Sequence, residues 1–167
     1  SGGKTLHLAA LMKNKGQIIA LDIYEWKLAE LKRRAKRAGA HNIETRMIDD
    51  NKVIKRLHEK ADRLLIDSPC SGLGVLKRNP DSKWKIDQAF IDRIKKEQEK
   101  ILQDYSKILK KGGKMIYATC SILPSENNEQ VETFLKNNDG FSLIKEEKVM
   151  PSEGFDGFYM ALIERKA

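Results

Sequence analysis

Short apolar runs alternate with amphipathic stretches along this chain, and this alternation limits its fold more than any other feature. The apolar and β-branched runs that indicate strands occupy residues 17–23, 43–48, 63–67 and 114–119. Apolar residues at helical spacing follow them and predict helices over residues 25–38, 53–59, 90–109 and 126–138. Because strands alternate with helices, the sequence predicts an α/β domain with a mostly parallel sheet and helices on both faces.

Local signals predict where these elements begin and end. Gly39 follows the helix over residues 25–38, and Gly112-Gly113 follow the long helix, as glycines commonly do past a helix C-terminus. Ser125 is expected to cap the helix that begins at residue 126. The last two apolar runs, residues 141–146 and 157–165, are expected to form an antiparallel pair at the edge of the sheet.

Length, charge and cysteine content narrow the class of protein. A chain of 167 residues suits one domain over residues 1–167, and no apolar run approaches the length of a membrane-spanning helix. Lys and Arg number 32 against 24 Asp and Glu, and this net charge of +8 favours a polyanionic partner. Two cysteines form no disulfide framework, so we expect a reducing, cytoplasmic location. Nothing in the sequence demands more than a monomer. The scattered His7, His41 and His58 predict no metal site.

The chain begins inside a glycine turn, Ser1-Gly2-Gly3-Lys4, which opens the first helix. A strand should precede such a turn, so we expect a further strand upstream of Ser1, at the centre of the sheet. Glycines at a helix N-terminus let backbone amides approach an anionic ligand. The turn therefore suits the phosphates of a P-loop NTPase, the amino-acid part of S-adenosylmethionine, or a nucleotide; simple helix capping is the structural alternative.

Carboxylates follow the predicted strands and bear on this choice. Asp22 lies 22 − 2 = 20 residues after Gly2, at the end of the next strand, where a carboxylate accepts hydrogen bonds from ribose hydroxyls. Its structural alternative is a cap for the helix that begins near Glu25. Asp67 ends an apolar strand and would hold magnesium in a P-loop enzyme.

Two cysteines stand at strand ends among polar neighbours. Cys70 lies three residues after Asp67, and Cys120 closes the strand over residues 114–119. If the two strands are neighbours, both thiols open onto one cleft. A thiolate there is a strong nucleophile when nearby positive charge or a helix N-terminus lowers its pKa. The alternatives are two buried apolar cysteines, or a disulfide that a reducing compartment disfavours.

Basic residues gather in two places. Those of the helix over residues 25–38 are interpreted as a solvated face. The loop over residues 77–85 carries Lys77, Arg78, Lys83 and Lys85 beside Trp84. Cations for phosphates and an aromatic ring for stacking are typical of surfaces that bind RNA or single strands.

Taken together, these motifs resemble those of one enzyme family. The matching strings are SGGKT, the acidic strand ends, DSPCSGLGVLKRNPD, YATCSILPSENNEQV and GFDGFYMALIER. They resemble the RNA 5-methylcytosine methyltransferases of the Sun/NSun (RsmB-like) family, from Ser1 to Arg165. The resemblance implies a Rossmann-like class I methyltransferase domain, S-adenosylmethionine as methyl donor and an RNA substrate, with ribosomal RNA preferred over transfer RNA.

The resemblance also implies roles for single residues. Ser1, Gly2, Gly3 and Lys4 would hold the methionine end of the donor, Asp22 its ribose, and Asp49 (or Asp50, one residue later) would lie near the adenine, with Asp67 also near the donor. Cys120 would be the nucleophile that adds to carbon 6 of cytosine, Asp67 would hydrogen-bond nitrogen 3, and Cys70 would assist loss of the carbon 5 proton and product release.

Other assignments stay open at this point. DNA cytosine-5 methyltransferases use the cysteine of a Pro-Cys turn as nucleophile, so Pro69-Cys70 admits the reverse assignment, whereas Thr119-Cys120-Ser121 favours the RNA type. A P-loop NTPase would leave both cysteines and Asp22 without a role. A catalytically silent RNA-binding module is disfavoured because both cysteines are present.

Overall fold

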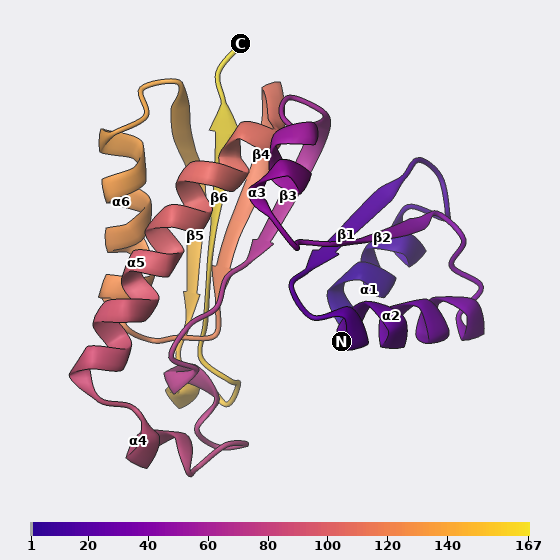
Figure 1. Cartoon of the computed structure of the whole chain (residues 1–167). Helices are drawn as coiled ribbons and strands as arrows, with labels where there is room; N and C mark the ends of the chain where they lie inside the picture. The colour runs from indigo at the N-terminus through magenta and orange to yellow at the C-terminus, as the bar shows by residue number, and fades with distance from the viewer. Residues whose placement is uncertain (1) are drawn as a thin grey trace. The chain divides into compact units, whose positions relative to one another are not determined.

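A computed structural model describes residues 2–167 and divides the chain into two compact units, Ser1–Arg56 and Leu57–Ala167 (Figure 1). Ser1 itself, predicted to belong to the glycine turn, lies outside the described residues. Each unit alternates strands and helices, which confirms the α/β class. The interpretation of residues 1–167 as one domain stays a prediction.

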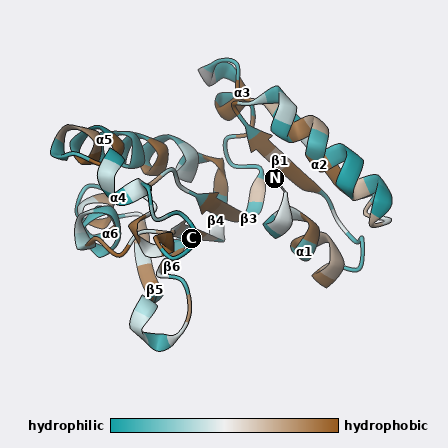
Figure 2. Ribbon diagram, turned by 90° about the horizontal axis from the view of Figure 1, so that it is seen from below, coloured by the Kyte–Doolittle hydropathy of each residue, from teal (hydrophilic) through white to brown (hydrophobic). Residues whose placement is uncertain are grey.

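The first unit is a strand–helix–strand motif with one further helix at each end. Its elements are α1 (Gly3–Leu11), β1 (Ile18–Asp22), α2 (Glu25–Arg37), β2 (Ile43–Met47) and α3 (Asn51–Arg56). β1 and β2 pair in parallel. α2 buries Leu28, Leu31 and Ala35, whose spacing places them on one helical face, while much of the helix is hydrophilic in Figure 2. Gly39 has a φ of +65° just past this helix, as the sequence predicts.

The second unit is built on a four-stranded sheet in the order β3-β4-β6-β5. These strands are β3 (Ala61–Asp67), β4 (Leu109–Thr119), β5 (Phe141–Val149) and β6 (Phe158–Arg165). β3 and β4 are parallel, and β6 is antiparallel to both β4 and β5, which confirms the antiparallel pair at the sheet edge. Within residues 2–167 the strands therefore form a two-stranded and a four-stranded sheet.

Two long helices cover one face of this four-stranded sheet: α5 (Gln88–Tyr105) and α6 (Asn128–Lys136) (Figure 1). The core between them and the sheet contains Leu102, Met115, Tyr117, Phe134 and Ile163, all 2% exposed or less. Along β6, buried and partly exposed residues alternate, as expected for a strand with one face on a core. Within the part of the chain that the structure describes, no helix is long and apolar enough to cross a membrane.

Gly112-Gly113 do not end the long helix, and this prediction is wrong. The helix ends at Tyr105, a 3₁₀ turn covers Ser106–Ile108, and β4 already begins at Leu109. Ala61 of β3 pairs with Leu109, whereas Arg63 pairs with Lys114, so β4 accommodates extra residues in a bulge. Gly112 takes a φ of +71° there, and a Cβ on Gly113 would lie 2.8 Å from Cγ of Leu109. The two glycines therefore serve a strand bulge.

Three other boundaries differ from the sequence prediction. α6 begins at Asn128 with Asn127 as its N-cap, and Ser125 lies in the preceding 3₁₀ turn Pro124–Glu126, so Ser125 is not the cap. α3 begins and ends earlier than residues 53–59, and Glu59 has a left-handed φ of +55°. The basic loop over residues 77–85 contains a short helix, α4 (Ser82–Lys85).

Candidate active site

The glycine turn of the first unit is shaped by a left-handed residue. Gly2 is the N-cap of α1 with a φ of +81°, and a Cβ there would lie 2.4 Å from Cδ1 of Leu31. Backbone conformation and packing therefore both require glycine at this position. Beyond it, the first amides of α1 have no partner within the helix, and its first turn holds no acidic side chain. This helix end presents N–H donors to an anionic group.

Asp22 is the last residue of β1, and its two oxygens face different neighbours. Oδ1 accepts a hydrogen bond from the backbone N–H of Tyr24 at 2.9 Å, and Oδ2 lies 3.8 Å from Nζ of Lys27. The N-cap of α2 is Tyr24, so Asp22 forms a local turn before the helix without being its cap residue. The Lys27 ammonium also lies 4.6 Å from the centre of the exposed Tyr24 ring. A carboxylate, an ammonium and an aromatic ring thus gather where β1 ends.

Asp49 and Asp50 follow β2, and the structure separates their surroundings. Oδ1 of Asp50 accepts a hydrogen bond from the backbone N–H of Lys52 at 2.7 Å, at the start of α3. Asp49 is exposed. Because Asp50 is used in the local turn, the arrangement favours Asp49 for contact with a ligand.

In the second unit, the structure brings Cys70 and Cys120 together. They follow the ends of the neighbouring parallel strands β3 and β4, and their Sγ atoms lie 3.2 Å apart, a hydrogen-bonding distance for thiols. Neither forms a disulfide, and both are partly buried. We call residues 68–72 and 120–123 the two cysteine turns. Asp67 is the last residue of β3 and is exposed. It pairs with Ala118 of β4, so it lies just before the two cysteine turns begin.

The two thiols are coupled through their hydrogen bond. The hydrogen bond to Cys120 raises the pKa of the Cys70 thiol well above its usual range, and burial and the charge of a Cys120 thiolate raise it further. Either sulfur can be the donor in this hydrogen bond. With Cys70 as donor, the bond would stabilise a Cys120 thiolate, and a thiolate, not a thiol, is the attacking species in nucleophilic chemistry.

A buried carboxylate that the sequence reasoning missed lies beneath the two turns. Glu126 is 0% exposed, and it accepts hydrogen bonds from the backbone N–H of Ser71 at 2.8 Å and from Nε2 of Gln98 at 3.1 Å. The hydroxyls of Ser71, at 2.5 Å, and of Ser121 also donate to it. One feature of the sequence could have indicated this buried acceptor: a serine directly follows each cysteine, Ser71 after Cys70 and Ser121 after Cys120.

The second cysteine turn is also held from both sides by Asn127. The Thr119 hydroxyl donates to Oδ1 of Asn127 at 2.5 Å, and Nδ2 of Asn127 donates to the carbonyl oxygen of Ser121 at 2.9 Å. Thr119 and Ser121 flank Cys120 directly. The backbone on both sides of Cys120 is therefore fixed by one buried side chain.

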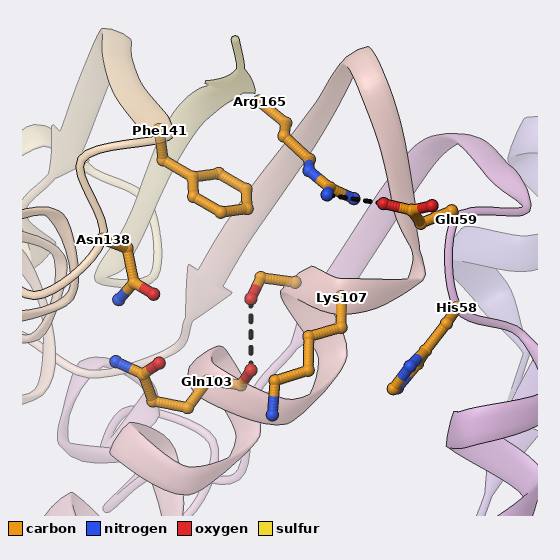
Figure 3. Close-up of a pocket in the computed structure, with 8 residues that line it drawn as sticks. His58, Glu59, Gln103, Lys107, Asn138, Phe141 and Arg165 are labelled. Carbon is orange, nitrogen blue, oxygen red and sulfur yellow. Dashed lines mark hydrogen bonds and ion pairs between the residues drawn. The ribbon is translucent and has the colours of Figure 1, made fainter. Parts of the chain in front are cut away.

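One cavity of the second unit lies away from the cysteines. A cavity of about 360 Å³ lies where β4 begins and β6 ends, and Figure 3 shows its lining, which includes Glu59, Phe141 and Arg165. Arg165 is engaged there, with Nη2 2.6 Å from Oε1 of Glu59 and Nη1 donating to the Leu109 carbonyl oxygen. A smaller cavity, about 200 Å³, lies beside the cysteine turns and includes Leu73, Ile122 and Phe155. Among residues 2–167, no three side chains are grouped as metal ligands.

The basic loop over residues 77–85 has the exposed aromatic ring that the sequence predicts, but some of its basic side chains form ion pairs. Trp84 is 82% exposed, with Nζ of Lys83 4.8 Å from its ring centre. Arg78, however, pairs with Asp156 at 2.8 Å, and Lys85 lies 4.0 Å from Asp81. The loop therefore offers one stacking surface with a cation beside it.

Comparisons with known proteins agree with this arrangement. A family model described as 16S rRNA methyltransferase RsmB/F matches residues 1–164. The chain is 35% identical to a probable ribosomal RNA small subunit methyltransferase B of Bacillus subtilis (strain 168), covering 99% of this chain and 41% of that protein. It is 34% identical to the Mus musculus tRNA (cytosine(72)-C(5))-methyltransferase NSUN6, covering 99% and 37%.

A similar solved structure is that of NSun6 from Pyrococcus horikoshii with SFG, at a TM-score of 0.88 and 28% identity, covering 99% of this chain and 46% of that one. This likeness confirms the Rossmann-like methyltransferase fold that the motifs predict. The chain spans less than half the length of each of these three proteins.

Proposed function

Because this chain belongs to the RsmB/F family of 16S rRNA methyltransferases, we propose that it methylates carbon 5 of cytosine in RNA, with S-adenosylmethionine as methyl donor. The observation that carries the proposal is the 3.2 Å separation of two sulfur atoms at the ends of neighbouring strands. Ribosomal RNA is the preferred substrate, with transfer RNA as the second. The family match and the two cysteines favour methyl transfer over the alternative of a P-loop NTPase.

The first unit has groups that fit the donor. The amides after Gly2 suit its carboxylate. Each oxygen of the Asp22 carboxylate can accept a further hydrogen bond beside its contact with Tyr24 or Lys27, which suits ribose hydroxyls. Gly3 and Lys4 are proposed to contact the methionine end of the donor. Asp49, exposed beyond β2, is proposed to lie near the adenine. When bound, S-adenosylmethionine supplies a methyl group on a positively charged sulfur, which is a strong electrophile.

The two cysteines answer a chemical need of cytosine. Carbon 5 of the ring is too weak a nucleophile to take a methyl group directly. The Cys120 thiolate forms a bond to carbon 6, and the electron pair of the carbon 5–carbon 6 double bond becomes available at carbon 5. Asp67 is assigned to nitrogen 3, where a proton shared between its carboxyl group and the ring nitrogen stabilises the negative charge that develops on the ring.

Product release reverses the thiolate addition. Once carbon 5 carries the methyl group, Cys70 assists loss of its proton to solvent, the double bond re-forms, and the bond between carbon 6 and Cys120 breaks with its electron pair returning to sulfur. The hydrogen bond that joins the two sulfurs would also stabilise the departing Cys120 thiolate. The assignment of Cys120, and not Cys70, as the nucleophile follows the family motif Thr119-Cys120-Ser121.

The target base must leave its stack to reach these groups. Trp84, exposed on the loop that follows the first cysteine turn, is proposed to stack on RNA, with Lys83 beside it.

A denaturing gel tests the mechanism. The natural full-length protein is incubated with RNA and S-adenosylmethionine as wild type, Cys70→Ala and Cys120→Ala. We expect a covalent protein–RNA adduct to accumulate in Cys70→Ala and to be absent in Cys120→Ala. The opposite pattern would make Cys70 the nucleophile. No methylcytosine and no adduct from wild type, with the donor bound, would indicate a catalytically silent RNA-binding module.

A further inference from the structure

Glu126 is a fully buried carboxylate that the proposed reaction does not use. It ends the 3₁₀ turn Pro124–Glu126, between the second cysteine turn and α6. Burying a carboxylate is costly unless hydrogen bonds replace the lost water. Its role therefore depends on which groups replace that water.

Four uncharged donors converge on the two oxygens of Glu126. Oε1 accepts from the backbone N–H of Ser71 and from Nε2 of Gln98, and Oε2 accepts from the hydroxyls of Ser71 and Ser121. Four donors use the whole acceptor capacity of a carboxylate. They come from three separate segments: each of the two cysteine turns and α5.

These bonds act where the strand ladder has ended. The last paired residues of β3 and β4 are Asp67 and Ala118, so both cysteines lie beyond the ladder. Ser71 follows Cys70 in the chain and Ser121 follows Cys120, and both serines bind the same carboxylate. Glu126 therefore links the two turns at positions one residue away from each sulfur-bearing residue.

The carboxylate is itself held in place by the core. The Tyr117 hydroxyl, on β4, donates to the backbone carbonyl oxygen of Glu126 at 2.8 Å. Nε2 of Gln98 also donates to the carbonyl oxygen of Pro69 at 2.9 Å, directly before Cys70. Both anchors, Tyr117 of β4 and Gln98 of α5, are themselves 0% exposed, so the linkage has little freedom to move.

We infer that Glu126 is a positioning residue for the two-cysteine reaction, and that its carboxylate sets the distance between the sulfur atoms of Cys70 and Cys120. This role rests on the proposed function for its effect on catalysis, although the distance itself can be tested without RNA. A glutamine is a weaker link, because its NH₂ group would face the two serine hydroxyls, which must then turn to accept, and the charge that strengthens all four hydrogen bonds is lost. Glu126→Gln should release at least one cysteine turn.

The test compares wild type, Glu126→Gln and Glu129→Gln in the natural full-length protein. Glu129 lies three residues further on, exposed on α6, and its substitution removes the same charge. The first measurement, without RNA or donor, is the rate at which diamide joins Cys70 to Cys120; each thiol loses a hydrogen atom, and diamide is reduced by taking up both. The second is kcat and KM for S-adenosylmethionine in RNA methylation.

We expect Glu126→Gln to slow the disulfide and to lower kcat by roughly 10- to 100-fold, with KM for the donor unchanged, because small misplacements of reacting groups are that costly. Glu129→Gln should match wild type in both measurements. Equal oxidation rates and equal kcat in the two variants would overturn the inference. A fall in melting temperature with a parallel rise in KM would assign Glu126 a purely structural role, which also overturns it.

A second variant keeps the test decisive if Glu126→Gln does not fold. Ser121→Ala removes one donor and adds no new one, so we expect smaller losses in the oxidation rate and in kcat; no change in either would overturn the inference. If wild type makes no methylcytosine, the proposed function fails, but the oxidation rates still decide whether Glu126 sets the sulfur distance. The two failures are therefore distinguishable.

Discussion

Gly157 donates its backbone N–H to the carbonyl oxygen of Gly74 at 2.7 Å, which joins the segment before β6 to the segment that follows the first cysteine turn. Gly74 donates in turn to the carbonyl oxygen of Cys120 at 2.9 Å. A Cβ on Gly74 would lie 2.3 Å from the Gly157 oxygen and 2.7 Å from the Cys120 oxygen. The backbones can approach this closely only because both residues lack a side chain.

Gly74→Ala should therefore destabilise the protein by roughly 1–3 kcal/mol, since a methyl group forced into a packed backbone contact must displace it. Urea unfolding measures the change. Gly140→Ala is the matched control, because a Cβ there would meet no atom within 4 Å. Equal unfolding midpoints for the two variants would contradict the close approach.

Removing Cys120 should make Cys70 more reactive. The hydrogen bond to Cys120 is the largest cause of the raised Cys70 pKa, so in Cys120→Ala that pKa should fall toward its ordinary value. At pH 9, about the ordinary pKa of a thiol, we expect iodoacetamide to alkylate Cys70 faster in Cys120→Ala than in wild type. Peptide mass mapping over a pH series reads this out; equal Cys70 alkylation profiles would argue against the coupling.

Two buried tyrosines should make the fold sensitive to alkali. Burial raises the pKa of both Tyr117 and Tyr159, and the hydrogen bond of the Tyr159 hydroxyl to Glu146 at 2.7 Å raises it further for that residue. The unfolded chain then loses these protons at lower pH than the folded one, so stability is present below about pH 10 and falls as the pH rises above it.

The expected loss in unfolding free energy is up to about 1.4 kcal/mol per pH unit for each tyrosine. Denaturant unfolding between pH 9 and pH 11 measures it. Tyr159→Phe should be less steep than wild type over this range, because one of the two groups is removed. An unchanged slope in that variant would show that Tyr159 does not contribute.

Asp22→Asn should weaken S-adenosylmethionine binding by roughly tenfold, because a hydrogen bond to a charged acceptor is replaced by one to a neutral acceptor. An asparagine oxygen can still accept from the Tyr24 N–H, so the turn before α2 should persist. Calorimetric titration of the full-length protein gives the Kd, with Asp50→Asn as control. A similar loss in both variants would place Asp22 outside the ribose contact.

The sequence was most informative where a pattern is local. The period of apolar residues located β1, β2, β3 and α2 to within a few residues, and polar residues at strand ends marked Cys70 and Cys120 as a pair. The spacing of apolar residues depends only on positions close together in the chain, so it predicts an element without knowledge of the segment that packs against it.

Features that depend on distant partners could not be predicted in this way. Gly112-Gly113 resemble a helix end, but the pairing of Leu109 with Ala61 turns them into a strand bulge. Ser125 resembles a cap, but the chain uses Asn127 there, with its side chain bonded to Thr119. Glu126 resembles a surface acid near a helix start, and its burial follows from Ser71, 55 residues earlier in the chain.

The pairing of the two sulfurs also has a consequence for how the protein is made. Cys70 and Cys120 are 50 residues apart, joined through a parallel crossover that contains α5. Contacts of this kind form slowly during folding, because a long segment must be ordered before they are gained. On a chain emerging from the ribosome, the two cysteines would behave as ordinary thiols, so their special reactivity would arise only after β4 has docked against β3.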